Sequence, residues 1–578
     1  MSLVFKKLSN SERSMYIYYP DYPMHNPYKL SSLTVLREDD KKESVEALLE
    51  TGLAKLAEEY KLVLCFPNPA QGGWNYTFDS DKEDDLTAIS QMQDSMNKEV
   101  DTPMTFNHLG IPTLESMLSA WHLMFDTRYL CGIGEGASMA YTFAACKPDA
   151  VAGLFGIGGS LSEMALKQAV KAPMHAVLVG AESKVQEYFV EANEAKEIEE
   201  ARAYIGEEGN AAVDNATQWI SYANSANPLQ SVTVSEQSLE VTEELLQYMW
   251  QQHFAKVRRM NTGAHGDVTA RTDLQKGFEW FIEDCAVDGT PHTWLVHTPE
   301  SVAANPEKKV PLMIFMHGGS DNPEEAAEMS KFHEIGEKEG FITVYPWGTN
   351  RAGWNSNMFP DEEDDTTYVC KLIDYLVEHN PIDAGRVYLS GFSNGAGMAQ
   401  VVAMVCPGKI AAICPIDANW PGTRVGASKV DYRDVIPMAI ALQKNYDYRM
   451  PIWYTYGTRE PSYPVYEGCS QQHQYDFWKL FNNIEVKFTP PQDNPHPCGC
   501  GVEGDVVEHP YPSEIYPHHH YSIQRFMSED EGAENLYNYV IMHDKGHEVA
   551  PMDPVLGWEY VKQFRRNADG SVERVEEN

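Results

Sequence analysis

One serine in this sequence lies between two glycines, in Gly391-Phe-Ser393-Asn-Gly395. An apolar run typical of a buried strand precedes the motif, and a run typical of a helix follows it at once. G-x-S-x-G in that context predicts a nucleophile elbow, a strained turn that lifts the serine hydroxyl clear of a sheet. We therefore predict that Ser393 is a nucleophile. The alternative is a glycine-rich turn with an incidental serine.

A nucleophilic serine needs a histidine base and an acid that orients the base. In the fold that carries this elbow, the acid and then the histidine follow the serine along the chain. Glu460 follows the apolar run PIWYTYG, and His547 follows NYVIMH. We therefore predict Ser393, Glu460 and His547 as a catalytic triad. His543 is a rival base, but it falls at the end of the predicted strand rather than in the loop beyond it.

Acyl transfer also needs N–H groups that hold the oxyanion. Asn394 begins the predicted helix after the serine, and Gly319 follows the apolar run LMIFM, so we predict both as oxyanion donors. Residues 417–450 separate the nucleophile region from the acid and are predicted to form a lid or a pocket wall. Substrate contacts are predicted for His317, Trp354 and Trp420.

The elements that position these residues alternate between strand and helix from about residue 290 onward. Short apolar runs such as VPLMIFM, FITVYP and RVYLSGF are typical of buried parallel strands. Amphipathic stretches such as DDTTYVCKLIDYLVEH separate them. This alternation predicts an α/β fold, a mostly parallel sheet flanked by helices, with its chemistry at the carboxyl ends of the strands.

This half of the chain resembles the polyhydroxybutyrate depolymerase-like and feruloyl esterase-like branch of the α/β-hydrolases. The resemblance covers roughly residues 290–570 and implies the same triad, with Glu460 where that branch usually has aspartate. It also implies carboxylic ester substrates, such as feruloylated or acetylated sugars or short hydroxyacid oligomers. The motifs that carry it are His317-Gly-Gly319, Tyr345-Pro-Trp-Gly348, Gly353-Trp-Asn355, Gly391 to Ala399, Gly457-Thr-Arg-Glu-Pro461 and Gly546-His547.

Four patterns of the second half recur in the same order in the first half. They predict two tandem α/β-hydrolase domains, residues 1–285 and residues 286–578, with a short linker near Asp284 to Pro291. The paired positions are Trp74 with Trp354, Asp126 with Asp383, Glu182 with Glu460, and His265 with His547.

The first copy has lost its nucleophile in this alignment. Gly134 stands where Ser393 stands, and the acidic pair Glu38-Asp39 replaces Gly318-Gly319. We therefore predict a degenerate, non-catalytic domain. The alternative is that Glu135 serves as a substitute nucleophile. The predicted roles for a silent copy are bracing the active one, covering its cleft, or forming a homodimer.

The charge and the apolar runs of the chain limit the classes of partner and the location that we expect. The 578 residues carry a formal net charge of −40, which argues against nucleic acid and anionic membranes as main partners. No apolar run is long enough to suggest a membrane-spanning helix, and no apolar stretch follows the basic residues near the start. We therefore expect a cytoplasmic protein with reduced core cysteines at positions 65, 131, 146, 370, 406 and 414.

No metal or cofactor is expected. His496, Cys498, Cys500 and the run His518 to His520 invite a zinc interpretation, but the cysteine spacing does not match zinc sites, and a Pro-rich surface loop is favoured. The sequence as a whole predicts a serine carboxylesterase that acts on a small-molecule or oligomeric ester. A peptidase or thioesterase with the same triad, and a non-catalytic binding or scaffold protein, are the alternatives.

Overall fold

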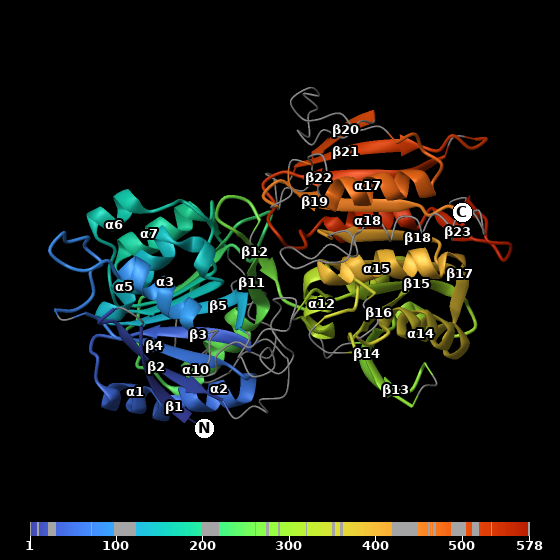
Figure 1. Ribbon diagram of the computed structural model, residues 1–578. Helices are drawn as coiled ribbons and strands as arrows, with labels where there is room; N and C mark the ends of the chain where they lie inside the picture. Colours follow the sequence, from blue (N-terminus) through green and yellow to red (C-terminus); the bar gives the residue numbers. More distant parts are fainter. Residues whose placement is uncertain are drawn as a thin grey trace. The chain divides into compact units, whose positions relative to one another are not determined.

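The computed structural model describes most of the chain (Figure 1). The described residues are 2–8, 11–20, 30–70, 72–96, 123–198, 219–260, 262–272, 277–286, 289–319, 321–349, 353–358, 362–418, 448–460, 463, 465, 470–486, 505–510, 520–532 and 534–575.

The described residues form two compact units that meet in sequence between Arg271 and Thr272. This differs from the predicted division at residue 285, because residues 284–291 are not a linker. They connect β13 (Phe278–Glu283) to β14 (His292–His297), which pair as an antiparallel hairpin of the second unit. Glycine and proline mark hairpin connections as readily as linkers, so composition did not separate the two.

The second unit contains a ten-stranded sheet. Its six central strands run parallel, and antiparallel strands extend it at both edges. The strand order is β13, β14, β16 (Ile342–Pro346), β15 (Val310–Met316), β17 (Ile382–Phe392), β18 (Ala412–Ile416), β19 (Ile452–Gly457), β22 (Asn535–Met542), β21 (His520–Met527) and β20 (Asp505–Pro510).

The first unit has a ten-stranded sheet of its own. Its order is β1 (Ser2–Lys7), β2 (Ser14–Tyr19), β4 (Val63–Pro67), β3 (Leu30–Leu36), β5 (Leu123–Ile133), β6 (Gly153–Ile157), β7 (Ala176–Val179), β10 (Ser231–Ser235), β9 (Ile220–Ala223) and β8 (Lys196–Glu197). Adding 12 to each strand number reproduces the order in the second unit. A two-stranded hairpin completes each unit, β11 (Val257–Met260) with β12 (Asp267–Ala270), and β23 (Phe564–Arg566) with β24 (Val572–Arg574).

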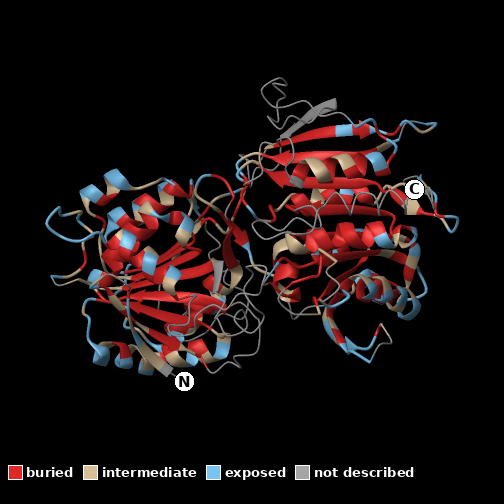
Figure 2. Cartoon of the chain, in the orientation of Figure 1, coloured by how far each residue is buried: buried red, intermediate tan, exposed pale blue. Residues whose placement is uncertain are grey.

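Helices cover both faces of each sheet and bury its apolar side chains (Figure 2). In the second unit, α14 (Asp365–His379), α15 (Asn394–Val405) and α17 (Ser470–Phe481) pack on one face. The other face carries α12 (Pro323–Ser330), α13 (Phe332–Glu339) and α18 (Asp553–Val561), and the short α11 (Glu300–Ala303) follows β14. The architecture is therefore the predicted α/β class.

The first unit has the same three layers. One face of its sheet carries α3 (Asp85–Ser95), α5 (Glu135–Cys146), α6 (Glu163–Gln168) and α7 (Ser183–Ala192). The other face carries α1 (Lys42–Leu48), α2 (Ala54–Tyr60) and α10 (Glu243–Tyr248).

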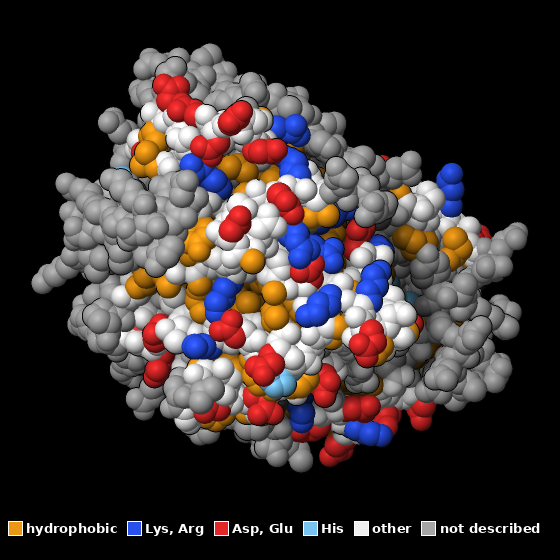
Figure 3. All heavy atoms as spheres, turned by 90° about the vertical axis from the view of Figure 1, so that its right-hand side faces the viewer, with side chains coloured by type: hydrophobic (Ala, Val, Ile, Leu, Met, Phe, Trp, Pro, Cys, Tyr) orange, Lys and Arg blue, Asp and Glu red, His pale blue; other side chains and the backbone are white. Residues whose placement is uncertain are grey.

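The surface drawn in Figure 3 carries lysine and arginine side chains interspersed with aspartate and glutamate. The large acid excess of the chain is therefore not gathered into a single-sign surface on that face. Within the described part of the chain, no helix is both long enough and apolar enough to cross a membrane.

Candidate active site

The nucleophile elbow forms where β17 meets α15. Ser393 has φ 51° and ψ −114°, in the left-handed region that residues other than glycine rarely adopt. Its N–H donates to the Ile416 carbonyl at 3.0 Å. A Cβ at Gly391 would lie 2.6 Å from the Gly395 carbonyl, and one at Gly395 would overlap the carbonyls at the end of β15. The glycines of the motif therefore let α15 pack directly against the sheet.

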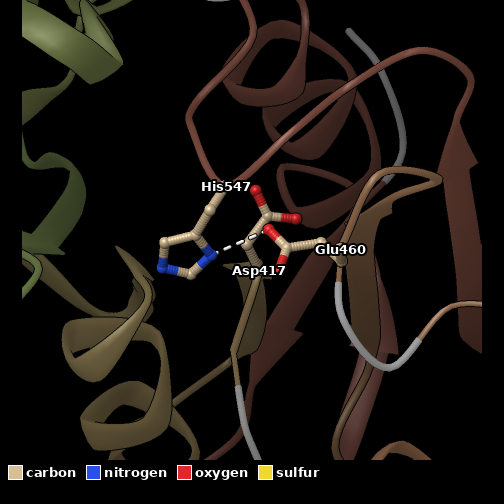
Figure 4. Close-up of side chains that lie close together, drawn as sticks. All are labelled: Asp417, Glu460 and His547. Atoms are coloured by element: carbon tan, nitrogen blue, oxygen red, sulfur yellow. Dashed lines mark hydrogen bonds and ion pairs between the residues drawn. The ribbon is translucent and has the colours of Figure 1, made fainter.

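The structure brings the three predicted triad residues together. The His547 Nε2 lies 2.8 Å from the Ser393 Oγ, and its Nδ1 lies 2.7 Å from the Glu460 Oε1. Figure 4 shows the imidazole beside the Glu460 carboxylate. Each residue follows a central parallel strand, namely β17, β19 and β22. The arrangement can pass a proton from the serine hydroxyl to an oriented imidazole.

The electrostatics favour this use of His547. Burial alone would lower the pKa of its imidazole, but the hydrogen bond and the charge of Glu460 outweigh burial and raise it above the usual value. The Glu460 carboxylate is almost fully buried, whereas the His547 side chain is about half exposed. The base therefore faces outward and the acid lies behind it.

The two predicted oxyanion residues are neighbours. A Cβ placed on Gly319 would lie 3.8 Å from the Asn394 Cβ. Asn394 is the first residue of α15, so its backbone N–H lies at the positive end of the helix dipole. Its side-chain Oδ1 accepts from the Trp354 N–H at 2.6 Å, and its Nδ2 donates to the Ser356 Oγ at 2.8 Å. The Asn394 amide therefore fixes the segment beside the elbow.

His317 and Trp354 were predicted to contact substrate, and the structure places both in the interior. The His317 Nε2 accepts from the Gly348 N–H at 3.0 Å, and the residue is fully buried. The Trp354 indole is 2% exposed and donates to the His317 carbonyl at 3.0 Å. The prediction of direct substrate contact is therefore wrong for both, and they instead hold the loops behind the elbow.

The same contacts explain why Gly-Trp-Asn recurs in the first unit. The Trp74 indole donates to the Arg37 carbonyl at 2.6 Å, as the Trp354 indole does to the carbonyl of His317. The Asn75 N–H donates to the Asp85 carboxylate, and the Asn355 N–H donates to the Asp365 carboxylate. The motif serves the fold in both units.

Several predicted features lie outside the described residues. These are Trp420, residues 419–447 of the predicted lid, His496, Cys498, Cys500, His518 and His519. The described His543 is not the base, because its Nε2 lies 2.9 Å from the Ser522 Oγ. In the described part of the chain, Asp417, Glu460 and His547 are the only cluster whose ligand atoms lie close enough to hold a metal ion. Two of these three residues, Glu460 and His547, are the ones whose side chains contact each other in the predicted triad.

Asp417 is a residue of the site that the sequence analysis did not single out. It follows β18, and its carboxylate lies 2.9 Å from the Lys545 Nζ. Lys545 also contacts Asp553 at 2.7 Å, and all three side chains are fully buried. A buried acid at the end of a central strand, next to Ser393 and Glu460 in strand order, was the available signal.

In the first unit, Gly134 occupies the elbow position. Its φ of 61° and ψ of −123° are close to those of Ser393, and it directly precedes α5 as Ser393 precedes α15. A Cβ on Gly134 would overlap the Glu38 Oε1. That carboxylate accepts from the Glu135 N–H at 3.3 Å, the group equivalent to the Asn394 N–H. Glu38 therefore occupies the place where a nucleophile and an oxyanion would sit.

The predicted equivalence of His265 and His547 is wrong. His265 lies in the hairpin of β11 and β12, whereas His547 follows β22. The hairpin is equivalent to that of β23 and β24, because Arg259 donates to the Val151 carbonyl just as Arg566 donates to that of Ile410. Both carbonyls precede strands, so His265 lies at the opposite end of the sheet from the elbow.

The loop that follows β10 is the true counterpart of the His547 loop, and residues 236–242 contain no histidine. Glu182, the predicted counterpart of Glu460, is an exposed residue at the start of α7. The described first unit therefore lacks the nucleophile and the base at their topological positions.

Two of the cysteines predicted to be reduced form a disulfide. Cys370 of α14 and Cys406 at the end of α15 are bonded, with their Cα atoms 6.8 Å apart. Cys65, Cys131, Cys146 and Cys414 are free, as predicted. The bond ties the nucleophile helix to its neighbour. Sequence spacing alone could not reveal it, because the two cysteines are 36 residues apart on different helices.

Comparison with known proteins shows which proteins part of the second unit is similar to. Residues 295–423 match the family model described as Esterase PHB depolymerase. The bifunctional acetylxylan esterase/xylanase XynS20E of Neocallimastix patriciarum is 29% identical over 36% of this chain and 28% of that protein. The poly(3-hydroxyalkanoate) depolymerase C of Paucimonas lemoignei is 31% identical over 21% of this chain and 30% of that protein.

The chain thus spans less than a third of the length of these two curated relatives. Among solved structures, an acetyl xylan esterase from Aspergillus awamori aligns with 49% of this chain and 98% of its own, at 14% identity and a TM-score of 0.35. The strand order and the elbow at Ser393 are consistent with the family match, because all three describe an α/β unit with a serine after a central strand. Over residues 295–423, which include the elbow at Ser393, the second unit is therefore similar to the family of esterases described as PHB depolymerases.

Proposed function

We propose that this protein hydrolyses carboxylic esters through an acyl-serine intermediate on Ser393. The observation that carries the proposal is the continuous contact from the Ser393 Oγ through His547 to the Glu460 carboxylate, at 2.8 Å and 2.7 Å. Hydrogen bonds of this length along nucleophile, base and acid are what nucleophilic catalysis requires.

In the proposed reaction, the Ser393 Oγ attacks the ester carbonyl while the His547 Nε2 takes its proton. Glu460 accepts the Nδ1 proton in a hydrogen bond and stabilises the imidazolium that forms. The backbone N–H groups of Asn394 and Gly319 hold the oxyanion. His547 then protonates the leaving alcohol, and in the second half it activates the water that releases the acid.

The proposed substrates are acetyl or feruloyl esters and short hydroxyacid esters. This class is supported by the names of the relatives, which include acetylxylan esterases, feruloyl esterases and a poly(3-hydroxyalkanoate) depolymerase. Thioester or peptide cleavage uses the same triad and is distinguished by turnover of matched ester, thioester and amide substrates. Nucleic acid and membranes are not proposed as partners.

We propose that the first unit is a duplicated copy that no longer hydrolyses esters. The shared strand order supports duplication. Two observations support the loss of esterase activity in this unit: the Glu38 carboxylate lies at the elbow, and residues 236–242 contain no histidine. The same observations argue against Glu135 as a nucleophile. Bracing the second unit, covering its cleft and forming a homodimer stay proposals for its role.

The cytoplasmic location expected from the sequence stays a prediction. The disulfide between Cys370 and Cys406 supports an oxidising compartment instead, because such bonds persist mainly outside the cytosol.

A screen of aryl and sugar acetates, feruloyl esters and 3-hydroxyacid oligomers on the full chain tests the proposed function. Turnover that disappears in Ser393→Ala is the expected result. The same turnover in the wild-type protein and in Ser393→Ala would overturn the proposal, as would a preference for amides over matched esters.

A further inference from the structure

Asp417 has a backbone conformation that the fold does not require of an aspartate. Its φ is 50°, and its N–H donates to the Thr455 carbonyl at 2.9 Å. The equivalent residue of the first unit is Gly158, with a φ of 72° and the same hydrogen bond, to Val179, at 2.8 Å. Glycine adopts this region freely, whereas other residues carry a steric cost.

Ser393 and Gly134 form a second pair of this kind, since Ser393 has φ 51° and Gly134 has φ 61°. At both places the first unit builds the same turn with glycine, and the second unit bears the strain of a side chain. Strain of this kind is kept where a side chain serves function. The comparison therefore groups Asp417 with Ser393, as two positions at the carboxyl ends of neighbouring strands where the second unit carries a side chain and the first unit carries glycine.

The contacts of Asp417 reach both sides of His547. Its Oδ2 lies 2.9 Å from the Lys545 Nζ, two residues before the histidine, and accepts from the Glu548 N–H at 3.2 Å, one residue after it. Lys545 is further fixed because its carbonyl accepts from the Arg459 N–H at 2.9 Å, next to Glu460. Asp417 thus holds the loop that carries His547 at two points, one on each side of the histidine. We call this pair of contacts, with the Lys545 Nζ and the Glu548 N–H, the clasp.

Asp417 also adds a second carboxylate beside the imidazole. One carboxylate oxygen each from Asp417 and Glu460 and a ring nitrogen of His547 lie within 4.8 Å of one another (Figure 4). Burial raises the pKa of Asp417, whereas the ion pair with the buried Lys545 ammonium lowers it and favours the charged carboxylate. The other charged group in this network is Asp553, on the far side of Lys545. The charge of Asp417 raises the pKa of His547, and that of Lys545 lowers it.

We propose that Asp417 is a positioning residue of the hydrolytic site, which clasps the His547 loop through Lys545 and the Glu548 N–H and places a second negative charge beside the His547–Glu460 pair. This rests on the proposed function of Ser393. A histidine held on both sides keeps its Nε2 at the nucleophile while Glu460 orients its Nδ1.

The test compares Asp417→Asn, Asp417→Ala and the matched control Asp553→Asn in the full chain. Asparagine keeps the shape and can still accept from the Glu548 N–H, whereas alanine removes the clasp. Asp553→Asn removes the other carboxylate of Lys545. That carboxylate accepts from the Ala550 N–H at 2.9 Å, three residues after His547, and from the Tyr521 hydroxyl at 3.0 Å. The readouts are the pH dependence of fluorophosphonate labelling of Ser393, and kcat and KM on an ester substrate.

Asp417→Asn is expected to move the acid limb of the labelling profile down by about one pH unit, because it removes a negative charge and leaves the Lys545 charge less compensated. Asp417→Ala is expected to lower kcat by about tenfold or more, with KM little changed, because the base loses its alignment. Asp553→Asn is expected to give a clearly smaller shift.

Folded Asp417 variants with wild-type profiles and kcat would overturn the inference, and so would an equal effect in Asp553→Asn. If Asp417→Ala does not fold, Asp417→Asn still decides through its pH profile. A wild-type protein whose Ser393 resists labelling would instead overturn the proposed function, so the two failures are distinguishable.

Discussion

Gly134 and Ser393 occupy the same turn in two sheets of identical strand order. Their backbone angles are φ 61°, ψ −123° and φ 51°, ψ −114°, and each directly precedes a twelve-residue helix. One unit places a hydroxyl at this turn, and the other places the Glu38 carboxylate of a neighbouring loop against the bare glycine. The two units therefore share an elbow but not a nucleophile.

Restoring a serine at the first elbow is expected to restore no activity. In the double variant Gly134→Ser, Ser393→Ala, the new side chain would overlap the Glu38 carboxylate. The loop that would supply a general base, residues 236–242, contains no histidine. Mass spectrometry after fluorophosphonate treatment should detect no adduct at residue 134. An adduct there, or ester turnover above that of Ser393→Ala, would show that the first unit retains a working base.

Glu460→Gln is expected to lower kcat by about a thousandfold, because the imidazole loses the carboxylate that orients and charge-balances it. The neutral imidazole is the active base, so activity falls as the pH drops through the pKa of His547. Glu460 raises that pKa, and its loss must therefore move the acid limb of kcat/KM to lower pH. The measurement is a pH–rate profile of the variant and the wild type.

Glu460→Asp is the matched control for that experiment, because it keeps the charge and shortens the side chain. It is expected to keep the acid limb closer to the wild-type position while lowering kcat. A Glu460→Gln protein with wild-type kcat and an unmoved acid limb would remove Glu460 from the triad.

Trp354→Ala is expected to destabilise the second unit by about 3–5 kcal/mol, since it empties a buried aromatic site and removes the hydrogen bond to the His317 carbonyl. The more conservative Trp354→Phe should keep KM close to wild type, because the ring does not face the substrate. Thermal unfolding and steady-state kinetics measure the two effects. A large rise in KM with unchanged stability would return Trp354 to the substrate site.

Reducing the disulfide between Cys370 and Cys406 is expected to lower stability by about 2–4 kcal/mol, because the bond closes a long loop in the unfolded chain. Denaturant unfolding with and without reductant measures the loss. The double variant Cys370→Ser, Cys406→Ser should show the lower stability under both conditions. An equal response to reductant in that variant would assign the effect to other cysteines.

Much of the site was predictable because its signals are local. The elbow needs small residues at fixed spacing around Ser393, and the acid and the base each follow a recognisable apolar strand. These three residues could be placed without any long-range contact. The fold class followed from the alternation of strand and helix in the same way.

What the sequence could not supply depends on side chains that meet only after folding. The sequences around His265 and His547 are similar, but the strand order assigns the two histidines to different loops. Trp354 follows a strand end, as a substrate contact would, yet its ring turns inward to the His317 carbonyl. The role of Asp417 depends on its contact with Lys545, which lies more than a hundred residues away in the sequence, so no local pattern indicates it.

Labelling of the full-length protein with a fluorophosphonate, followed by peptide mapping, tests the central claim most directly. A single adduct is predicted on Ser393, formed faster as the pH rises through the pKa of His547 and absent from Ser393→Ala. The account would be contradicted by a folded wild-type protein that stays unlabelled, or by ester turnover that persists in Ser393→Ala.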